Sequence, residues 1–404
     1  MNRILIFSHY LGALKYLDEL YHELENNNCE VVYGFWQESQ FLGRMIEYCE
    51  SNSRKYYRLH YQGELFYNRM LYRLSVNKML DKLKPDIVIQ TDDMHFFQNE
   101  IVHRARDRNI PTLVIQWALT MPEEIHVRSK ERNRSLKKAT ESKVGKIIKG
   151  TILYINRIIN KLLGLDYGNK LSIAQGDSDK VAVINEYSKD LFIKQGVNEE
   201  KIAVTGHFEL DSAVAALRKN PVRKLDTVKI LYISDPFYTK DLKRITLIEQ
   251  LEYVKKVYSS AGSLLGNYCF YLKLHPAEYV EDYSEFKDLP NLVLKENFDT
   301  EISINNSDLI ICSASTLLMS AVAAGKPIVT LNILNIPEVK EILEVMGIDD
   351  QIVVSWESLN QIMQLFKENP EKLVRKINPY FLLNNGQCKR RAVDLILEMM
   401  QNES

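Results

Sequence analysis

The chain has 404 residues, of which 46% are hydrophobic and 26% are charged, and its formal net charge is −1 at pH 7. This length exceeds one ordinary hydrophobic core, so two domains are expected, and the composition is typical of a globular protein. The balanced charge argues against general nucleic-acid binding, which needs a large basic excess.

The cysteines are odd in number, scattered and mostly inside apolar runs, which is typical of buried thiols in a reducing cytoplasm. The sequence contains no CxxC pair, which would indicate a zinc site, so we predict neither a metal nor a bound cofactor. No apolar run reaches the roughly 18 residues that a membrane span needs. We therefore expect a cytoplasmic protein.

In the first half, short apolar runs alternate with longer helical patterns. The expected strands are Ile4–Phe7, Glu30–Tyr33, Asp86–Gln90, Thr112–Ile115 and Val181–Ile184. The spacing of apolar residues predicts helices at Leu14–Leu24, Phe66–Leu83 and His95–Arg108. This alternation indicates a parallel sheet with helices on both faces.

Polar and aromatic residues follow several of these strands, at the sheet edge where open α/β sheets bind ligands. Asp92 and Asp93 follow the third strand, and one of them can serve as a general base because adjacent carboxylates repel and raise a pKa. Capping of the next helix is the alternative. His9 and Trp117 would face an acceptor or cleft, although a turn residue and a buried aromatic are equally ordinary explanations.

An insertion at 118–178 interrupts the first sheet unit. Within it, residues 126–165 combine a strongly basic run with an apolar run that contains further basic residues. Such a basic amphipathic stretch suits an anionic membrane surface, and a helical hairpin packed on its own domain is the alternative. The basic run contains Arg128, Lys130, Arg132, Arg134, Lys137, Lys138, Lys143, Lys146 and Lys149.

The second half repeats the alternation of strands and helices, so two Rossmann-like units are expected. We predict domains at 1–205 and 206–384 and a C-terminal helix at 385–404. The expected strands are Lys229–Ile233, Tyr268–Lys273, Leu292–Leu294, Leu309–Cys312 and Ile328–Thr330.

Two of these strands lead into polar clusters that predict a phosphate site. The first cluster contains a histidine, and the second precedes a helical pattern, whose free backbone N–H groups and positive end favour an anion. Strand termination and helix capping are the alternatives; Glu278 could instead bind a nucleotide hydroxyl, and Asp235 could line the site or form a turn. The predicted donor-site residues are Asp235, Lys273, His275, Pro276, Glu278, Ser313, Ser315 and Thr316.

Residues 306–329, read with the His275-Pro276 pair, resemble the donor site of GT-B fold glycosyltransferases. The two clusters are similar to the donor motifs of bacterial sialyltransferases and capsule transferases that use CMP-activated sugars, and of the related CDP-glycerol glycerophosphotransferases. Those enzymes also carry two carboxylates followed by glycine in the first domain. Asp92 and Asp93 match this motif, but Met94 replaces the glycine.

Two departures from these family patterns narrow the choice of donor nucleotide. Ser320 stands where many GT-B enzymes have a ribose-binding glutamate, which disfavours the common UDP-sugar and GDP-sugar groups. UDP-N-acetylglucosamine 2-epimerases share the fold, but their corresponding segment looks like Ser-Gly-Gly followed by paired glutamates. Residues 315–317 of this chain offer neither feature. A cytidine nucleotide is therefore the expected donor.

The resemblance implies an α/β protein of the GT-B fold, with two Rossmann-like domains facing across a cleft and a C-terminal helix returning toward the first. Its implied activity is transfer of a sugar from a CMP- or CDP-linked donor to a glycan or lipid-linked acceptor in surface polysaccharide synthesis, on the inner face of the plasma membrane. Asp92, Asp93 and His275 would be catalytic. A CDP-glycerol glycerophosphotransferase and a non-catalytic GT-B-like binding protein remain alternatives.

Overall fold

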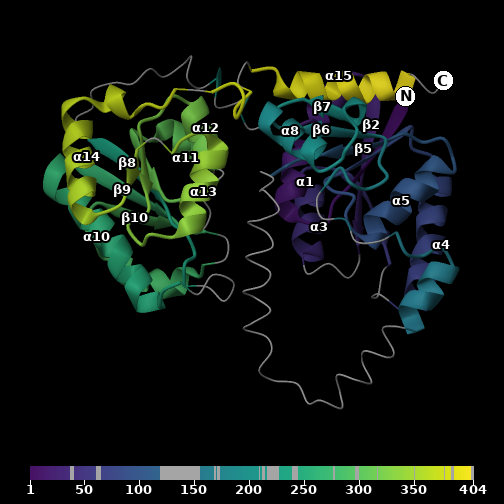
Figure 1. Ribbon diagram of the computed structural model, residues 1–404, viewed down its shortest axis with the longest axis horizontal. Helices are drawn as coiled ribbons and strands as arrows, with labels where there is room; N and C mark the ends of the chain where they lie inside the picture. The colour runs from purple at the N-terminus through teal and green to yellow at the C-terminus, as the bar shows by residue number, and fades with distance from the viewer. Residues whose placement is uncertain are drawn as a thin grey trace, which may run out of the picture. The chain divides into compact units, whose positions relative to one another are not determined.

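The computed structural model divides into two compact units (Figure 1). Unit 1 comprises residues 1–208 and 387–404, and unit 2 comprises residues 209–386. The structure describes all residues except 37–40, 61–64, 119–154, 168–169, 171–172, 209, 212–213, 216–226, 239–243, 276–277, 296–299, 316, 350, 377, 384–385 and 402–404.

Unit 1 contains a seven-stranded parallel sheet in the order β3-β2-β1-β4-β5-β6-β7. The chain adds strands to one side of β1 and then returns to its other side, so the strand order reverses between β1 and β4. In a doubly wound sheet this reversal opens a crevice at the carboxyl edge. The strands are β1 Asn2–Phe7, β2 Cys29–Trp36, β3 Lys55–Leu59, β4 Ile87–Gln90, β5 Thr112–Ile115, β6 Lys180–Val183 and β7 Ile202–Val204.

The predicted helix at Phe66–Leu83 is confirmed as α4, whereas the pattern at Leu14–Leu24 forms two helices. A further helical segment covers residues 155–162, and most of the expected basic insertion, 119–154, lies outside the described residues. The helices of unit 1 are α1 Leu11–Asp18, α2 Tyr21–Asn26, α3 Leu42–Ser51, α4 Phe66–Leu83, α5 Phe96–Arg106, α8 Glu186–Lys194, η1 Glu199–Lys201 and α15 Cys388–Gln401.

The C-terminal helix α15 belongs to unit 1, as expected. Its buried residues Cys388, Ala392 and Ile396 join the core cluster formed by β1, β2 and α1. Lys389 pairs with Glu19 at 2.5 Å. The helix therefore completes the hydrophobic core of the unit that begins with the first strand.

Unit 2 contains a six-stranded parallel sheet in the order β10-β9-β8-β11-β12-β13, which reverses between β8 and β11. The strands are β8 Val228–Ile233, β9 Tyr268–Lys273, β10 Leu292–Lys295, β11 Leu309–Cys312, β12 Ile328–Leu331 and β13 Ile352–Val353. The helices are α10 Leu247–Leu265, η2 Val280–Phe286, α11 Thr300–Asn306, α12 Leu317–Ala323, α13 Pro337–Met346, α14 Trp356–Glu368 and η3 Pro370–Leu373.

Burial on both faces explains why the central strands can be predicted from the sequence. The last four residues of β1 and all four residues of β11 are buried, because helices cover both faces of each parallel sheet. Such strands read as continuous apolar runs. Within the described residues, no helix is both long and apolar enough to cross a membrane.

Candidate functional site

In unit 2 the strand ends that flank the reversal are joined by a hydrogen bond. Asp235 follows β8 and Ser313 follows β11, and the Ser313 backbone N–H donates to Asp235 Oδ2 at 3.1 Å. Burial raises the pKa of Asp235 to about 6, although the bonds from Ser313 act in the opposite direction. Asp235 therefore fixes the turn that leads from β11 toward α12.

The neighbouring strand β9 ends in two cationic or titratable side chains. Burial lowers the pKa of Lys273, and the nearby Glu278 carboxylate opposes this shift. His275 is exposed, yet partial desolvation and the Lys273 charge lower its pKa. At neutral pH the His275 ring is therefore mainly uncharged, so in the catalytic role expected from the sequence it can act as a neutral hydrogen-bond donor.

Glu278 is buried and its carboxylate is occupied by partners from its own unit. It accepts bonds from the His275 backbone N–H at 2.7 Å, from Ser234 Oγ at 3.0 Å and from the Tyr283 hydroxyl at 2.5 Å. These bonds tie the ends of β8 and β9 to the η2 segment. In this geometry Glu278 positions the His275 backbone.

Ser315 has the capping geometry that was the alternative to phosphate binding. Its hydroxyl accepts from the Leu317 backbone N–H at 3.3 Å, and its carbonyl accepts from Leu318 N–H at 3.0 Å. Pro276 and Thr316, which were predicted for the same site, lie outside the described residues. Unit 2 thus brings Asp235, Lys273, His275, Ser313 and Ser315 to one sheet edge.

In unit 1 the two strands that flank the reversal, β1 and β4, are each followed two residues later by a titratable side chain, His9 and Asp92. The distance from His9 Nε2 to Asp92 Oδ2 is 3.6 Å, which is too long for a good hydrogen bond. Burial raises the pKa of Asp92 to about 7, and the charge of Asp93 adds to this shift. Burial and then the neighbouring His95 lower the pKa of His9 to about 4. Near neutral pH Asp92 titrates beside an uncharged imidazole.

Aromatic rings surround this pair. The His9 ring stacks on Trp36 with centroids 5.3 Å apart, and Tyr10 lies 4.0 Å from His9 and 6.4 Å from Trp117. Tyr10 is 43% exposed, so part of this aromatic surface faces solvent. The sequence interpretation missed Trp36, because the residue is the last of a strand longer than predicted; its only signal is the aromatic at the end of an apolar run.

Asp93 differs from Asp92 in being fully buried and bonded. Its carboxylate accepts from Ser178 Oγ at 2.6 Å and from Ala174 N–H at 3.0 Å, with Lys201 Nζ 3.9 Å away. A Cβ at Gly176 would lie 2.2 Å from the Asp93 carbonyl oxygen, so glycine permits this close approach. Asp93 therefore holds the 174–178 segment in place, while Asp92 remains the partly accessible carboxylate.

The expected alternative of helix capping is not how the two carboxylates are used. Helix α5 has His95 as its N-cap residue, and the His95 side chain makes no capping bond. Asp92 accepts a long bond of 3.4 Å from the Met94 backbone N–H, and the Gln98 side chain also favours its charged form. The sheet edge, rather than the helix end, accounts for their placement.

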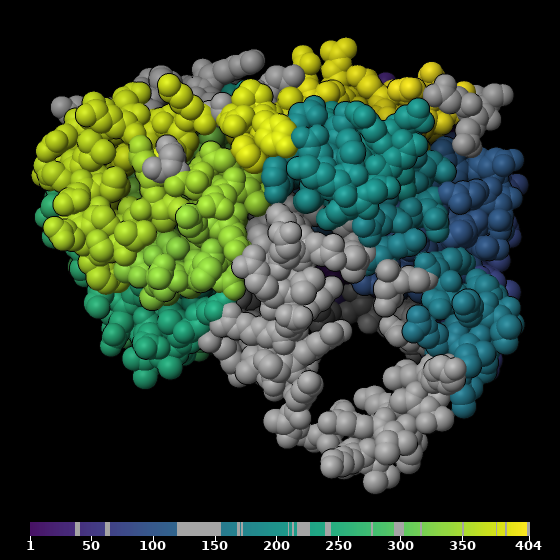
Figure 2. Space-filling view, in the orientation of Figure 1, coloured from purple at the N-terminus to yellow at the C-terminus, as the bar shows by residue number. Residues whose placement is uncertain are grey.

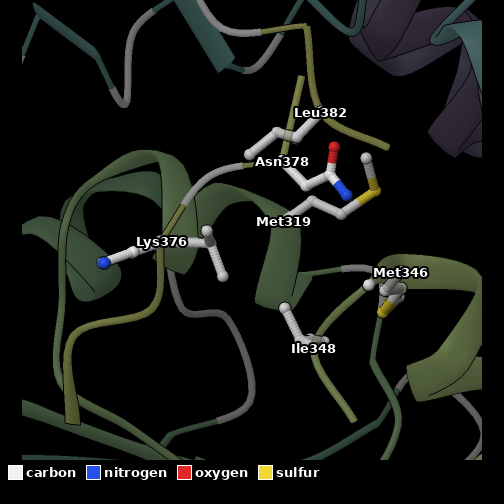
Figure 3. A pocket seen from close by; sticks show the side chains of 8 residues that line it. Met319, Met346, Ile348, Lys376, Asn378 and Leu382 are labelled. Atoms are coloured by element: carbon white, nitrogen blue, oxygen red, sulfur yellow. The ribbon is translucent and has the colours of Figure 1, made fainter. Parts of the chain in front are cut away.

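Two hollows in the described residues lie away from these edges. One, of about 10 Å³, has room for about one water and is lined by Met319, Met346 and Leu382 of unit 2 (Figure 3). The other, of about 510 Å³, lies at the opposite, amino end of β1, β2 and β3, beside Arg3 and Lys55. Neither contains the predicted site residues. In the part of the chain that the structure describes, no group of three or more His, Cys, Asp or Glu residues could hold a metal ion.

No family model matches this chain, and no curated protein matches it. Solved structures match over nearly the whole length. A UDP-GlcNAc 2-epimerase from Neisseria meningitidis has 17% identity and a TM-score of 0.57, with 98% of this chain and 100% of that chain covered. A UDP-GlcNAc 2-epimerase from Methanocaldococcus jannaschii has 15% identity and a TM-score of 0.59, with 98% and 100% covered.

MurG from Acinetobacter baumannii has 13% identity and a TM-score of 0.52, with 98% of this chain and 100% of that chain covered. At these identities the similarity shows the fold alone. Together with the two parallel sheets of seven and six strands, it shows that the chain has the GT-B fold.

Proposed function

We propose that the chain is a nucleotide-sugar-dependent glycosyltransferase in which unit 2 binds the donor and unit 1 supplies the base. The observation that supports this proposal is the arrangement at the carboxyl edge of unit 2. There Asp235, Lys273 and Ser313 lie at the ends of three neighbouring strands, on both sides of the strand reversal. In open α/β sheets this position is the usual ligand site.

The donor phosphate would bind beside Lys273 and His275. In transfer, the acceptor oxygen forms a bond to the anomeric carbon while the bond from that carbon to the phosphate oxygen breaks. The nucleotide leaves with the electron pair, and the Lys273 ammonium and a His275 N–H stabilise the developing charge. The lowered pKa of Lys273 has burial as its main cause, which places this ammonium in a partly dry setting where such stabilisation is stronger.

The acceptor hydroxyl needs a base, and Asp92 has the better surroundings for that role. Its pKa of about 7 places the carboxylate near the value at which general bases work best at neutral pH. Asp93, by comparison, is committed to Ser178 and Ala174. The proton of the acceptor hydroxyl would pass to Asp92, while the rings of Trp36 and Tyr10 offer apolar surface for the acceptor.

The proposed donor is a sugar linked to a cytidine nucleotide, whereas the proposed acceptor is defined only by its class. The His-Pro motif and Ser320 favour a cytidine nucleotide, whereas several structural neighbours are named for UDP-GlcNAc. The acceptor would be a glycan or lipid-linked sugar in surface polysaccharide synthesis, with the protein in the cytoplasm at the inner membrane face. No metal is assigned to the reaction.

A sugar-nucleotide epimerase is the second candidate, because UDP-GlcNAc 2-epimerases are among the matched structures. The two candidates differ in their products. A transferase releases nucleotide and makes a larger saccharide only when an acceptor is added, whereas an epimerase converts the donor without an acceptor. A CDP-glycerol transferase would release CMP and add a glycerol phosphate to the acceptor.

A thermal-shift series with CMP, CDP, UDP and GDP tests the donor site. A ligand at 100 times its Kd stabilises the folded protein by about 2.7 kcal/mol, so a real site gives a clear shift. We expect the largest shift with a cytidine nucleotide and its loss in His275→Ala. The exposed His22 lies in unit 1, and His22→Ala is the matched control.

Each outcome of this series has a distinct meaning. A preference for UDP or GDP overturns the cytidine assignment while keeping the donor site. No shift with any nucleotide at millimolar concentration contradicts the enzyme proposal. A shift without turnover of any CMP-, CDP- or UDP-linked sugar supports the non-catalytic alternative.

A further inference from the structure

The helical segment at residues 155–162 is amphipathic, but its polar face is buried and its apolar face is exposed. Asn156 and Asn160 are buried, whereas Ile155, Ile158 and Leu162 on the other side are exposed, with Leu162 81% exposed. The positions 155, 158 and 162 share one helix face. A helix on a water-exposed surface normally turns its apolar side inward, so the outward aliphatic side chains require an explanation.

Polar bonds to α4 account for the inward asparagine face. Asn156 Oδ1 accepts from the backbone N–H of Phe66, the first residue of α4, at 2.8 Å. The Arg73 guanidinium donates to the Gly164 carbonyl at 2.7 Å. The segment therefore runs beside the first half of α4, bonded to it at Asn156 near its start and at Gly164 just beyond its end.

Helix α4 adds a second outward apolar stripe next to the first. Leu71 and Leu74 are 59% and 60% exposed, and Tyr67 is also exposed, while Tyr72 and Val76 form the stripe that packs into unit 1. Figure 2 shows the 155–162 segment at the surface of unit 1. We call the six outward residues the α4 apolar face: Tyr67, Leu71, Leu74, Ile155, Ile158 and Leu162.

The exposed charges of the two segments are mainly positive, although Arg73 is paired with the buried Glu100 and Arg157 lies 4.0 Å from Asp166. The two segments, Phe66–Leu83 and 155–162, contain six basic residues and one acidic residue. The Arg157 side chain, between Ile155 and Ile158, is 82% exposed. A second copy of this chain would bring like charges together, whereas an anionic lipid surface complements them. The basic residues are Arg69, Arg73, Lys78, Lys82, Arg157 and Lys161, and the acidic one is Asp81.

We propose that the α4 apolar face docks unit 1 onto an anionic lipid bilayer. The leucine and isoleucine side chains would enter the boundary between headgroups and acyl chains, about 5–10 Å deep, with Arg157 and Lys161 at the phosphate level. These six side chains lie on α4 and on the 155–162 segment, which are bonded to each other. This proposal stands independently of the reaction that the protein performs.

Liposome flotation of the full-length protein tests the proposal. Vesicles of phosphatidylglycerol and phosphatidylcholine should carry the protein, and vesicles of phosphatidylcholine alone should carry much less of it. We expect Leu71→Asp with Leu162→Asp to lower the partition coefficient at least about tenfold, because a charge replaces inserted apolar surface. Ile248→Asp is the matched control, since Ile248 is 71% exposed on α10 of unit 2.

A second variant separates charge from insertion. Arg157→Gln with Lys161→Gln should weaken binding to the anionic vesicles and reduce its dependence on salt, while leaving the small binding to neutral vesicles unchanged. Unchanged flotation of the aspartate double variant overturns the proposal. So does a wild-type dimer that this variant dissociates while neither protein binds vesicles, because the face would then be a contact between copies. Circular dichroism of each variant checks that the fold is retained.

Discussion

The carboxylates at the two strand reversals follow the same pattern but have different surroundings. Asp92 in unit 1 and Asp235 in unit 2 each come two residues after a buried parallel strand, and burial raises the pKa of both, to about 7 and about 6. Asp235 accepts a firm bond from the Ser313 N–H at 3.1 Å. Asp92 has the long bond from the Met94 N–H, a smaller pKa-lowering contribution from the Gln98 side chain, and an imidazole 3.6 Å away.

A raised pKa by itself therefore does not identify a base. Asp235 is held by the turn that it shapes, so its proton affinity reflects the burial of a structural group. The Asp92 side chain keeps 14% of its surface exposed, so a substrate hydroxyl can reach it. Asp92 and Asp93 show the same contrast, because Asp93 holds the 174–178 segment whereas Asp92 stays partly accessible.

The largest effect should come from Asp92→Asn. Loss of a positioned base typically lowers a rate 10²- to 10⁴-fold, and the nucleotide-induced thermal shift should be unchanged, because the interaction belongs to the transition state. Turnover is measured as nucleotide release with acceptor present, with the exposed Asp107→Asn as the control. Near-normal turnover of Asp92→Asn would move the search for the base to His9.

Asp93→Ala should act on stability instead. The substitution leaves the Ser178 hydroxyl and the Ala174 N–H without their buried acceptor and removes the charge near Lys201, so the free energy of unfolding should fall by about 2–4 kcal/mol. Urea unfolding followed by fluorescence measures this. A loss below about 1 kcal/mol would mean that the 174–178 segment does not depend on Asp93.

The pH dependence of Asp92 has a defined sign. Its pKa in the folded protein, about 7, lies above the ordinary value near 4, so the folded state binds more protons between these values. The free energy of unfolding should therefore fall as pH rises from about 4 to 7, by roughly 3 kcal/mol, and Asp92→Asn should flatten this slope. Turnover should rise with pH up to about 7, since the base must be deprotonated.

Chemical unfolding of the wild type and Asp92→Asn at several pH values provides the measurement. The signal is a difference between the two proteins, so other titrating groups cancel. Parallel stability profiles would contradict the raised pKa and weaken the assignment of Asp92 as the base.

The smallest expected effect concerns unit 2. Tyr283→Phe removes the hydroxyl that donates to the buried Glu278 carboxylate and should cost about 1 kcal/mol of stability. Tyr238→Phe is the matched control, because its partner Asp282 is partly exposed and its loss should cost less. If Tyr238→Phe cost more than Tyr283→Phe, Glu278 would not be the group that organises this edge.

Much of the fold could be predicted because the central strands are buried on both faces. Runs such as Ile4–Phe7 and Leu309–Cys312 have no polar interruption and are confirmed as β1 and β11. Strand β3 was missed since only Leu59 of its five residues is buried at the sheet edge, which leaves no clear apolar pattern. Strand β13 was missed because two residues are too few to show a period.

The candidate site was predictable in position but not in roles. Placement after strands identified His9, Asp92, Asp235 and Lys273, because parallel strands end at one sheet edge. The partners that distinguish Asp92 from Asp93 lie about 80 residues later, at Ala174 and Ser178, and a sequence alone does not reveal such pairs. For the same reason the outward apolar stripe of α4 was read simply as a helix.

The return of α15 to unit 1 has a consequence for synthesis on the ribosome. Lys389 and Glu19 are 370 residues apart, and Arg391 donates to the Thr205 carbonyl across 186 residues. Unit 1 is translated first but lacks part of its core until α15 emerges, whereas unit 2 is complete by residue 386. We expect nascent chains stalled before α15 to protect unit 2 from protease while unit 1 remains cleavable and open to chaperones.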